Sequence, residues 1–384
     1  MDINDSAKGK VVFQPSVLRV KGGGIFVRLK KIVFGFALCA ALFTGCQSGG
    51  DKSGVTDKTA KTSKQGDCVE AQKDIFAMDT YMTVKTYGKA AEKAADAAVD
   101  EINRLDDMFS TGNKESEIAI LNDNGSEILS KETGTLIERS CDLYKSTDGA
   151  FNIAVYPLMK EWGFTNEKYK VPDEKTIKGL LKNIDVSKIK YNKKKRQITL
   201  PENYKIDLGG IAKGYTSSRL MEIFKKYKLD GGIVSLGGNV QTYGHKDGSK
   251  NWKVAIENPE TSPFDGDYLG VLKITDKAVI TSGSYERYFE KDGKRYHHIL
   301  DPKTGRPAES GLISVSVISD DGTLADGLST SLFIMGKKKG EKYWQENRDK
   351  FDVVWLEEDG TVTITDGIKD VFSSDFKYSV VSDE

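Results

Sequence analysis

Histidine, cysteine and an excess of charge of either sign are scarce or absent in this sequence. Its 384 residues include three histidines and four cysteines, and no two cysteines stand in C-x-x-C spacing. The absence of this spacing argues against the common zinc-binding and thioredoxin-like motifs. Lys plus Arg and Asp plus Glu each number 57, so the formal net charge is zero. Because nucleic-acid binding needs a basic excess that releases counterions, we expect no nucleic-acid partner.

The N-terminal residues are typical of an export signal rather than of folded structure. A basic cluster at 28–31 precedes an apolar run at 32–43 that is too short to span a bilayer. The run ends in T-G-C at Cys46, which resembles the lipobox of bacterial lipoproteins. On this interpretation residues 1–45 are the signal, Cys46 carries the lipid, and the exported chain is anchored at the extracytoplasmic face of the bacterial cell membrane. The alternative is an ordinary secretory signal with an incidental cysteine.

The segment after Cys46 predicts a tether followed by one large domain. Residues 46–73 contain mostly Ser, Gly, Lys, Thr and Asp, the composition of a flexible linker. The rest, 74–384, is long enough for one domain with a sizeable core. Signal peptides begin a few residues before their basic cluster, whereas 27 residues precede Arg28 here. If translation starts at Val27, residues 1–26 are an artefact and do not belong to the protein.

Helices and strands alternate without a regular βαβ order after residue 74. Hydrophobic residues at three- and four-residue spacing, together with turn signals, predict helices over 90–109, 132–147, 172–181, 323–335 and 340–347, and one that opens after 207–214 and ends near Tyr227. Runs of β-branched and aromatic residues predict strands over 80–87, 231–239, 252–257, 270–274, 278–282, 285–290, 295–300, 311–319, 351–356 and 361–365. This order favours an α+β fold.

A glycine-dense segment, D-L-G-G-I-A-K-G at 207–214, is the first candidate binding element. Glycines let the backbone approach a ligand, and the free N–H groups of the helix that follows favour an anion. Lys213 adds a full positive charge. The segment is neither a Walker A loop nor a G-x-G-x-x-G loop. The alternative is a tight strand-to-helix connection without a ligand.

A second candidate is the segment L-A-D-G-L-S-T at 324–330. On a helix Asp326 and Thr330 are four residues apart and share a face, with Ser329 beside them. A carboxylate with hydroxyl groups suits a hard cation such as Mg²⁺, which prefers oxygen ligands. The alternative is that Asp326 caps the helix while the hydroxyl groups bond back to its carbonyl groups.

The adjacent His297 and His298 precede I-L-D-P-K-T-G at the end of an apolar strand. Neighbouring residues of a strand point to opposite faces, so both rings cannot enter one site. One histidine can orient or protonate a phosphate ester. Either can instead cap the strand or pack in the core. Ser282-Gly283-Ser284 is a possible nucleophile loop, but no base stands near it in the sequence.

Taken in order, these motifs resemble those of the ApbE family, the FAD:protein FMN transferases, from about residue 74 to residue 335 and more weakly beyond. The motifs that carry the resemblance are M-D-T at 78–80, G-A-F-N at 149–152, W-G-F at 162–164, D-L-G-G-I-A-K-G at 207–214, S-L-G-G-N at 235–239, T-S-G-S-Y at 281–285, H-H-I-L-D-P-K-T-G at 297–305 and A-D-G-L-S-T at 325–330. The resemblance implies a T-fold-like α+β architecture with mixed and antiparallel sheets. It also implies binding of FAD and Mg²⁺, and transfer of FMN to a threonine or serine hydroxyl of an acceptor protein with release of AMP.

The resemblance also assigns roles to individual residues. It implies that the metal ligands are Gly210 (through its carbonyl), Asp326, Ser329 and Thr330, and that the FAD contacts are Met78, Ala150, Phe151, Asn152, Asp207, Lys213, His298 and Ile299. His298 rather than His297 matches the histidine expected near the diphosphate, as a base or as an orienting group, and Asp326 is implied in catalysis through the metal. One departure is Ser110-Thr111-Gly112, where relatives often carry an aromatic residue after Ser-Thr.

Three functions compete at this point. The first is the flavin transferase, whose partner is a flavinylated acceptor, either a membrane redox subunit or an exported flavoprotein. The second is a Mg²⁺-dependent FAD pyrophosphatase, in which water replaces the acceptor hydroxyl. The third is a non-catalytic flavin-binding lipoprotein.

Overall fold

The computed structural model describes residues 69–246, 250–261 and 267–382. The predicted signal segment, the lipid-bearing Cys46 and most of the predicted tether lie outside these residues. The last tether residues do not, because the first strand, β1, spans Glu70–Ala77. The first strand of the described residues therefore begins at Glu70, four residues before the predicted start of the domain. No helix among the described residues is both long and apolar enough to cross a membrane.

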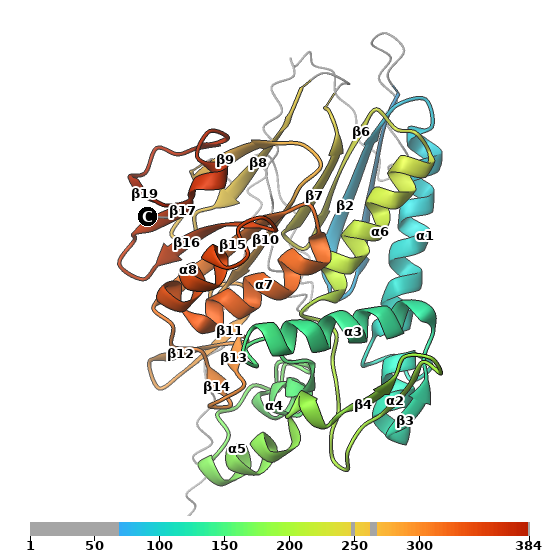
Figure 1. Ribbon diagram of the computed structural model, residues 1–384, viewed down its shortest axis with the longest axis vertical. Coiled ribbons are helices and arrows are strands. Elements are labelled where there is room, and N and C mark those ends of the chain that lie inside the picture. The colour runs from blue at the N-terminus through green and yellow to red at the C-terminus, as the bar shows by residue number, and fades with distance from the viewer. Residues whose placement is uncertain (1–68, 247–249, 262–266, 383–384) are drawn as a thin grey trace, which may run out of the picture.

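A nine-stranded sheet forms the centre of the molecule (Figure 1). Its strands, in spatial order, are β1, β2 (Thr80–Tyr87), β6 (Gly231–Leu236), β7 (Asn239–Gly244), β10 (Ala278–Gly283), β15 (Leu312–Ser319), β16 (Asp352–Glu357), β17 (Val362–Thr365) and β19 (Tyr378–Val381). Neighbours pair antiparallel except β17 and β19, which are parallel. The sheet and its helices confirm the predicted α+β class.

Three helices cover one face of this sheet (Figure 1). They are α1 (Ala91–Phe109), α6 (Ala212–Lys226) and α7 (Gly322–Met335). Helix α1 buries Ala91, Ala94, Ala95 and Ala98 at three- and four-residue spacing. These small side chains form the apolar stripe of an amphipathic helix and let α1 lie close to β1 and β2. The buried surface of all three helices supplies the hydrophobic stabilisation of this layer.

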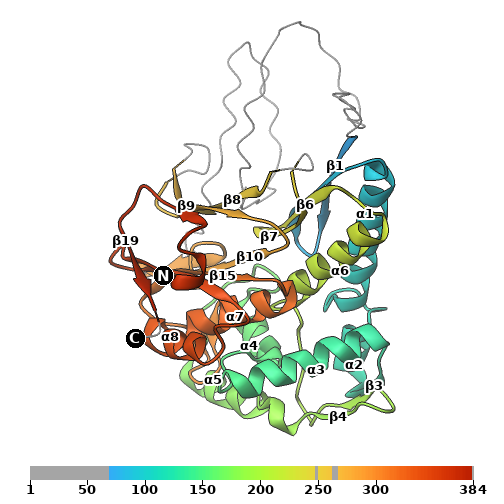
Figure 2. The same ribbon diagram turned by 45° about the horizontal axis from the view of Figure 1, so that its top comes forward.

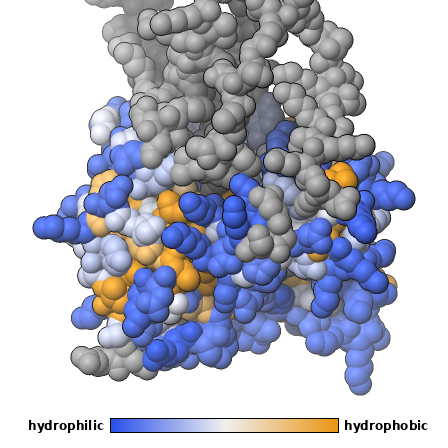
Figure 3. Space-filling view, turned by 90° about the horizontal axis from the view of Figure 1, so that it is seen from above, coloured by the Kyte–Doolittle hydropathy of each residue, from blue (hydrophilic) through white to orange (hydrophobic). Residues whose placement is uncertain are grey.

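A smaller sheet covers part of the opposite face. Its strands, in spatial order, are β18 (Phe372–Ser373), β9 (Tyr268–Ile274) and β8 (Trp252–Glu257). Trp252 and Leu272 of this sheet share a core with Val240 and Val354 of the large sheet. The face seen from above is mostly hydrophilic in its described part, with a group of hydrophobic residues on the left (Figure 3).

A helical region below the sheet, residues 110–206, completes the domain (Figures 1 and 2). It contains α2 (Glu117–Asn124), β3 (Ser126–Ile128), α3 (Lys131–Ser146), α4 (Tyr156–Trp162), α5 (Glu174–Leu180), β4 (Lys190–Asn192), β5 (Gln197–Thr199) and three short 3₁₀ turns at 153–155, 181–183 and 186–188. Trp162 Nε1–H donates to the Gly305 carbonyl at 2.8 Å, and Arg287 Nη2–H donates to the Phe164 carbonyl at 2.6 Å. These bonds tie the helical region to the segments before and after the His pair.

Most predicted elements are confirmed, with shifts of a few residues at their ends. The hairpin around Asp292-Gly293 consists of β11 (Tyr288–Lys291) and β12 (Lys294–His297), and α8 spans Lys337–Gln345. Several elements were not predicted. They are the strand pair β13 (Leu300–Asp301) and β14 (Arg306–Pro307), the strands β1, β7 and β19, and the helices α2 and α4. Except for β7, which lies between β6 and β10, these are short or edge elements that carry too few residues for a clear periodic signal.

Helices α6 and α7 cross in direct contact at two glycines. A Cβ atom built on Gly214 would lie 2.1 Å from the Gly322 carbonyl oxygen and 2.5 Å from Asp326 Cβ. Gly214 lies within α6 and Gly322 begins α7, so neither glycine is needed for a turn. Their missing side chains instead allow the backbones of the two helices to approach closely. The crossing determines where the second turn of α7 lies relative to the start of α6.

We expect Gly214→Ala to lower the free energy of unfolding by about 1–3 kcal/mol, because its methyl group would push α7 away from α6. Chemical denaturation would measure this loss. Gly179→Ala in α5 is the matched control, since no atom lies within 4 Å of its Cβ position. Alanine there should leave stability unchanged or raise it by up to about 1 kcal/mol. Equal effects of the two substitutions would contradict the close crossing.

Candidate functional site

Helix α7 brings the predicted carboxylate and hydroxyl groups to one place. Asp326 lies in its second turn, and Thr330 follows one turn later on the same face. Asp321 caps the helix, since its carboxylate accepts the Leu324 N–H at 3.1 Å. The capping role that the sequence left open for Asp326 therefore belongs to Asp321.

The Asp326 carboxylate is buried between α6, α7 and β7, with 5% of the residue exposed. One oxygen accepts the Gly214 N–H at 2.7 Å, and the other accepts the Asn239 side-chain amide at 3.0 Å. Burial raises the pKa of Asp326, whereas the charge of Lys213 and the two hydrogen bonds lower it. No ion pair with Asp326 occurs within 4 Å among the described residues. A buried carboxylate with neutral donors and spare lone pairs is suited to a cation.

Three hydroxyl groups meet beside Asp326. Ser282 Oγ, at the end of β10, lies 2.8 Å from Ser329 Oγ and 3.1 Å from Thr330 Oγ1. The Ser329 hydroxyl donates to the Asp326 carbonyl at 2.9 Å, and the Ser329 side chain is fully buried. Ser329 was expected to be a metal ligand, but its hydroxyl proton points into the helix and its oxygen lies among hydroxyl groups. Thr330 keeps some exposed surface.

The glycine-dense segment lies next to the start of α7. The aromatic ring of Phe151 is 3.5 Å from the Cβ position of Gly210 and 3.5 Å from that of Gly327, so Gly210 and α7 flank the same ring. The Asp207 carboxylate accepts the Gly209 N–H at 2.7 Å, and this bond fixes the bend. Ile211, the residue before α6, provides no side-chain cap. Of the first three N–H groups of α6, that of Ala212 donates to the Leu208 carbonyl at 2.9 Å and that of Gly214 donates to Asp326. Only the Lys213 N–H has no partner among the described residues and can bind an anion.

Two cations face this region. Lys213 and Arg287 both influence the pKa values of Asp207, Glu286 and His298 through their charges. Neither makes an ion pair within 4 Å in the part of the chain that the structure describes. Burial raises the pKa of Glu286, although its side chain keeps contact with solvent, which limits the rise.

His298 has a defined tautomer. Its Nδ1 lies 3.2 Å from the Arg287 carbonyl oxygen, which can only accept, so Nδ1 carries the hydrogen in the neutral ring. Nε2 then has a free lone pair and can accept a proton. Burial by the surrounding protein, together with the positive charges of Arg287 and Lys213, holds the pKa of His298 well below its ordinary value. The ring is therefore neutral at neutral pH.

His297 lies on the opposite side and faces the core. Its Nε2 is 3.1 Å from the Ala308 carbonyl, and its ring packs edge-on against Phe333. Nδ1 has no hydrogen-bond partner among the described residues. The two rings therefore enter different surroundings, as alternation along a strand predicts.

Met78 occupies the turn between β1 and β2. Met78 and Asp79 both have positive φ values, 48° and 59°, as a two-residue hairpin turn requires. The Met78 sulfur lies 3.9 Å from the Thr216 hydroxyl on α6, one turn after Lys213. Asp79 influences the pKa of Asp207 through its charge. The hairpin turn thus lies beside the glycine-dense segment.

The other predicted FAD contacts are partly occupied by structural bonds. Ala150, Phe151 and Ile299 are buried in the core. The Asn152 side chain accepts the Ala154 N–H at 2.7 Å and donates to the Ile184 carbonyl at 2.8 Å. Phe151 lies against Gly210, but no contact links Asn152 or Ile299 to Asp326. Their roles toward a ligand remain predictions.

Several residues of this region were not predicted from the sequence. Asn239 bonds Asp326, Arg287 supplies both a carbonyl and a charge to His298, and Glu286 adds a carboxyl group. Ser282 was considered as part of a nucleophile loop, whereas the structure places it among the α7 hydroxyl groups. Asn239 follows a Gly-Gly turn after a buried strand, and this position was the available signal.

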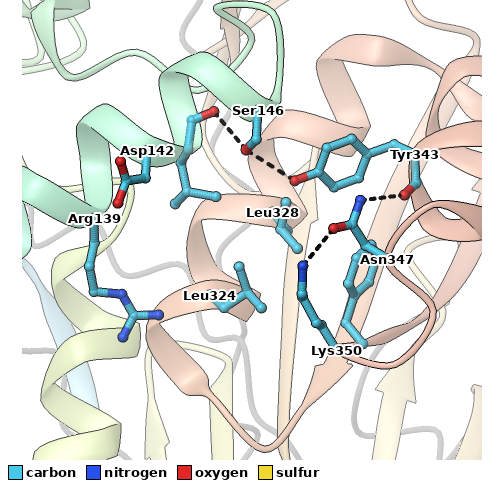
Figure 4. A pocket seen from close by; sticks show the side chains of 10 residues that line it. Arg139, Asp142, Ser146, Leu324, Leu328, Tyr343, Asn347 and Lys350 are labelled. Atoms are coloured by element: carbon cyan, nitrogen blue, oxygen red, sulfur yellow. Dashed lines mark hydrogen bonds between the residues drawn. The ribbon is translucent and has the colours of Figure 1, made fainter.

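A larger cavity lies on the far face of α7 and is separate from this site. It has a volume of about 250 Å³ and is lined by Leu324 and Leu328 together with residues of α3, α8 and 347–351 (Figure 4). Its polar side chains bond one another: Tyr343 to Ser146 at 3.1 Å and Lys350 to Asn347 at 2.9 Å. Leu324 and Leu328 point away from the face that carries Asp326.

The donors around Asp326 fit a hard divalent cation. The ligand atoms predicted from the sequence, namely the Asp326 carboxylate, the Thr330 hydroxyl and the Gly210 carbonyl, are all oxygen atoms. The described residues contain no cluster of three or more His, Cys, Asp or Glu side chains that could hold a metal by itself. A site with one carboxylate, one hydroxyl and one backbone carbonyl leaves positions for phosphate oxygens and waters, as Mg²⁺ prefers.

Comparisons with known proteins show similarity in sequence and in fold to one family. A family model described as the ApbE family matches residues 78–355. An FAD:protein FMN transferase of Klebsiella pneumoniae is 33% identical over 253 residues, which are 65% of this chain and 78% of the relative. One of Vibrio cholerae is 32% identical over 75% of this chain and 84% of its own length. The crystal structure of the ApbE protein of Thermotoga maritima superposes with a TM-score of 0.74 at 32% identity, covering 79% of this chain and 99% of that one. The flavin transferase ApbE of Vibrio cholerae gives a TM-score of 0.69 at 25% identity, covering 79% of this chain and 99% of that one.

We expect the His298 imidazole to titrate well below pH 6.5, because burial and two positive charges disfavour its protonated form. With three histidines in the chain, NMR can follow each ring, and His298→Gln identifies the signal. Arg287→Gln should move the midpoint upward. Arg295→Gln, whose charge acts on His297 instead, should not. A His298 midpoint at or above 6.5 in the unsubstituted chain would refute this description.

Proposed function

The chain belongs to the ApbE family, and we infer from this membership and the site that it is an FAD:protein FMN transferase. The observation that carries the proposal is the meeting of four elements beside Asp326. They are a buried carboxylate without an ion-pair partner among the described residues, a hydroxyl one turn further along α7, the start of α6 without a side-chain cap, and two cations free of carboxylate partners among those residues. This set suits the diphosphate of FAD together with a divalent cation.

Asp326 and Thr330, with the Gly210 carbonyl, would hold Mg²⁺. When bound, Mg²⁺ supplies neutralisation of the charge that develops on the diphosphate oxygens. Lys213, through its ammonium group and its backbone N–H, would bind the diphosphate from the side of the glycine-dense segment. Arg287 adds a second positive charge on the side of His298.

His298 would accept the proton of the acceptor hydroxyl through its free Nε2. The acceptor oxygen forms a bond to the phosphorus of the FMN half as the bond to the AMP oxygen breaks, and AMP leaves. The low pKa of His298 keeps the ring unprotonated before the reaction. The Nδ1–H bond to the Arg287 carbonyl fixes the orientation of the ring.

The chain is also proposed to be a lipoprotein attached through Cys46 at the extracytoplasmic face of the membrane, where its acceptor protein would be a membrane redox subunit or an exported flavoprotein. The support is the sequence of the signal segment and the composition of the residues between Cys46 and β1. A tether of this kind would let the domain reach acceptors near the membrane surface.

Asp326→Ala is expected to lower transfer of FMN at least about 100-fold, because the metal that neutralises the charge developing on the diphosphate loses its carboxylate ligand. The assay combines the protein, FAD, Mg²⁺ and an acceptor protein. Protein-bound flavin fluorescence reports the transferase, free FMN with AMP reports a pyrophosphatase, and unchanged FAD reports a carrier. FAD binding should be largely kept in the variant. The exposed Asp320→Ala should retain normal transfer.

Cys46→Ser is expected to move the exported chain from the detergent phase to the aqueous phase in a detergent-partition experiment, because the lipid would be lost. If the unsubstituted chain already partitions into the aqueous phase, the ordinary secretory signal is the correct interpretation. This experiment is independent of the transfer reaction.

A further inference from the structure

The three hydroxyl groups beside Asp326 form a chain that ends on a backbone carbonyl. Ser282 Oγ stands in the middle, 2.8 Å from Ser329 Oγ and 3.1 Å from Thr330 Oγ1. The far end is the Asp326 carbonyl, which accepts from Ser329 at 2.9 Å. Ser329 is fully buried, so no solvent molecule competes for its hydroxyl group.

The carbonyl determines the direction of every hydrogen in this chain. A carbonyl oxygen can only accept, so the single hydrogen of Ser329 is used there. Ser329 Oγ must then accept from Ser282, which uses the single hydrogen of Ser282. Ser282 Oγ in turn accepts from Thr330. The one hydrogen of Thr330 is therefore directed at Ser282.

A threonine hydroxyl whose hydrogen is fixed in this way presents only lone pairs on its other side. A metal-binding hydroxyl must do the same, because a hydrogen pointing at the cation would be repelled. A freely rotating hydroxyl would have to be oriented at the moment of binding, whereas Thr330 is already oriented. The hydrogen-bond chain thus prepares one ligand of the cation before the cation arrives.

We propose that Ser282 and Ser329 are positioning residues that orient the Thr330 hydroxyl toward the divalent cation, rather than ligands themselves. This inference rests on the proposed function, since it assumes a cation between Asp326 and Thr330. It gives a role to Ser282, at the end of β10, and replaces the direct metal contact expected for Ser329. Both serines then act through Thr330 alone.

The same strand provides a matched control. Thr281, the residue before Ser282, points to the other face of β10, where its hydroxyl lies 2.7 Å from Ser316 Oγ of β15. Ser316 is 1% exposed. Ser316→Ala therefore removes a buried hydroxyl–hydroxyl contact of similar length from the same part of the sheet, without touching α7.

Mn²⁺ binding measured by electron paramagnetic resonance tests the proposal without any turnover. We expect Ser282→Ala and Ser329→Ala each to weaken Mn²⁺ binding about 10-fold, the lower end of the range for residues that support a metal ligand. Ser282→Thr, which keeps the hydroxyl group, should bind as the unsubstituted chain does. Ser316→Ala should also bind normally, with a loss of thermal stability similar to that of Ser282→Ala.

A double substitution separates positioning from direct binding. Thr330→Val removes the ligand, so adding Ser282→Ala to it should weaken Mn²⁺ binding no further. If Ser282→Ala binds Mn²⁺ normally, or weakens it by the same factor in the Thr330→Val background, the positioning role is overturned.

Asp326→Ala distinguishes failure of this inference from failure of the proposed function. Loss of Mn²⁺ binding in Asp326→Ala, with normal binding in both serine variants, overturns only the positioning role. Normal Mn²⁺ binding in Asp326→Ala overturns the metal site itself and, with it, both proposals.

Discussion

The hydrogen bond from the Gly214 N–H to the Asp326 carboxylate is the contact on which the site depends. It joins the start of α6 to the second turn of α7, and it forms only because residue 214 has no side chain to keep the helices apart. Through this bond the glycine-dense segment, Lys213 and the α7 face take fixed relative positions. The same carboxylate also accepts from Asn239 and so connects both helices to the sheet. The close packing of α6 on α7 and the hydrogen bonding of a buried carboxylate therefore both depend on the position of Asp326.

Two cations of the site form no ion pair although the chain as a whole has zero net charge. Lys213 and Arg287 lie near the carboxyl groups of Asp207 and Glu286 but within 4 Å of no carboxylate oxygen among the described residues, whereas Arg306, for example, pairs with Glu174 at 2.6 Å on the surface. Surface pairs of this kind contribute little to stability. Lys213 is half-buried and Arg287 is exposed, so both positive charges stay accessible to an anionic ligand. The arrangement is therefore understandable as preparation for a polyanionic substrate rather than as a source of stability.

The sequence predicted the α+β class and most long elements, because α1, α3 and α7 and the central strands have enough periodic residues to reveal their buried faces. The motifs also indicated Asp326, Thr330, Lys213 and His298. What could not be predicted was which side chains meet from distant positions. Asn239 and Ser282 reach α7 only through the pairing of β7 with β10 and the packing of α7 on that sheet. Sequence spacing contains no information on such pairings. The tautomer of His298 likewise depends on a carbonyl eleven residues earlier.

Two different parts of the domain hold the two halves of the site. The helical region grips the segment around His298 through Trp162 and Phe164, whereas Asp326 is held by α6 and the central sheet. A dinucleotide that contacts both halves of the site would link these two parts of the domain through its own contacts. Opening either part alone would then require breaking ligand contacts, so local unfolding events that are independent in the free protein should become coupled in the complex. Substrate would in this way change the cooperativity of unfolding as well as its midpoint.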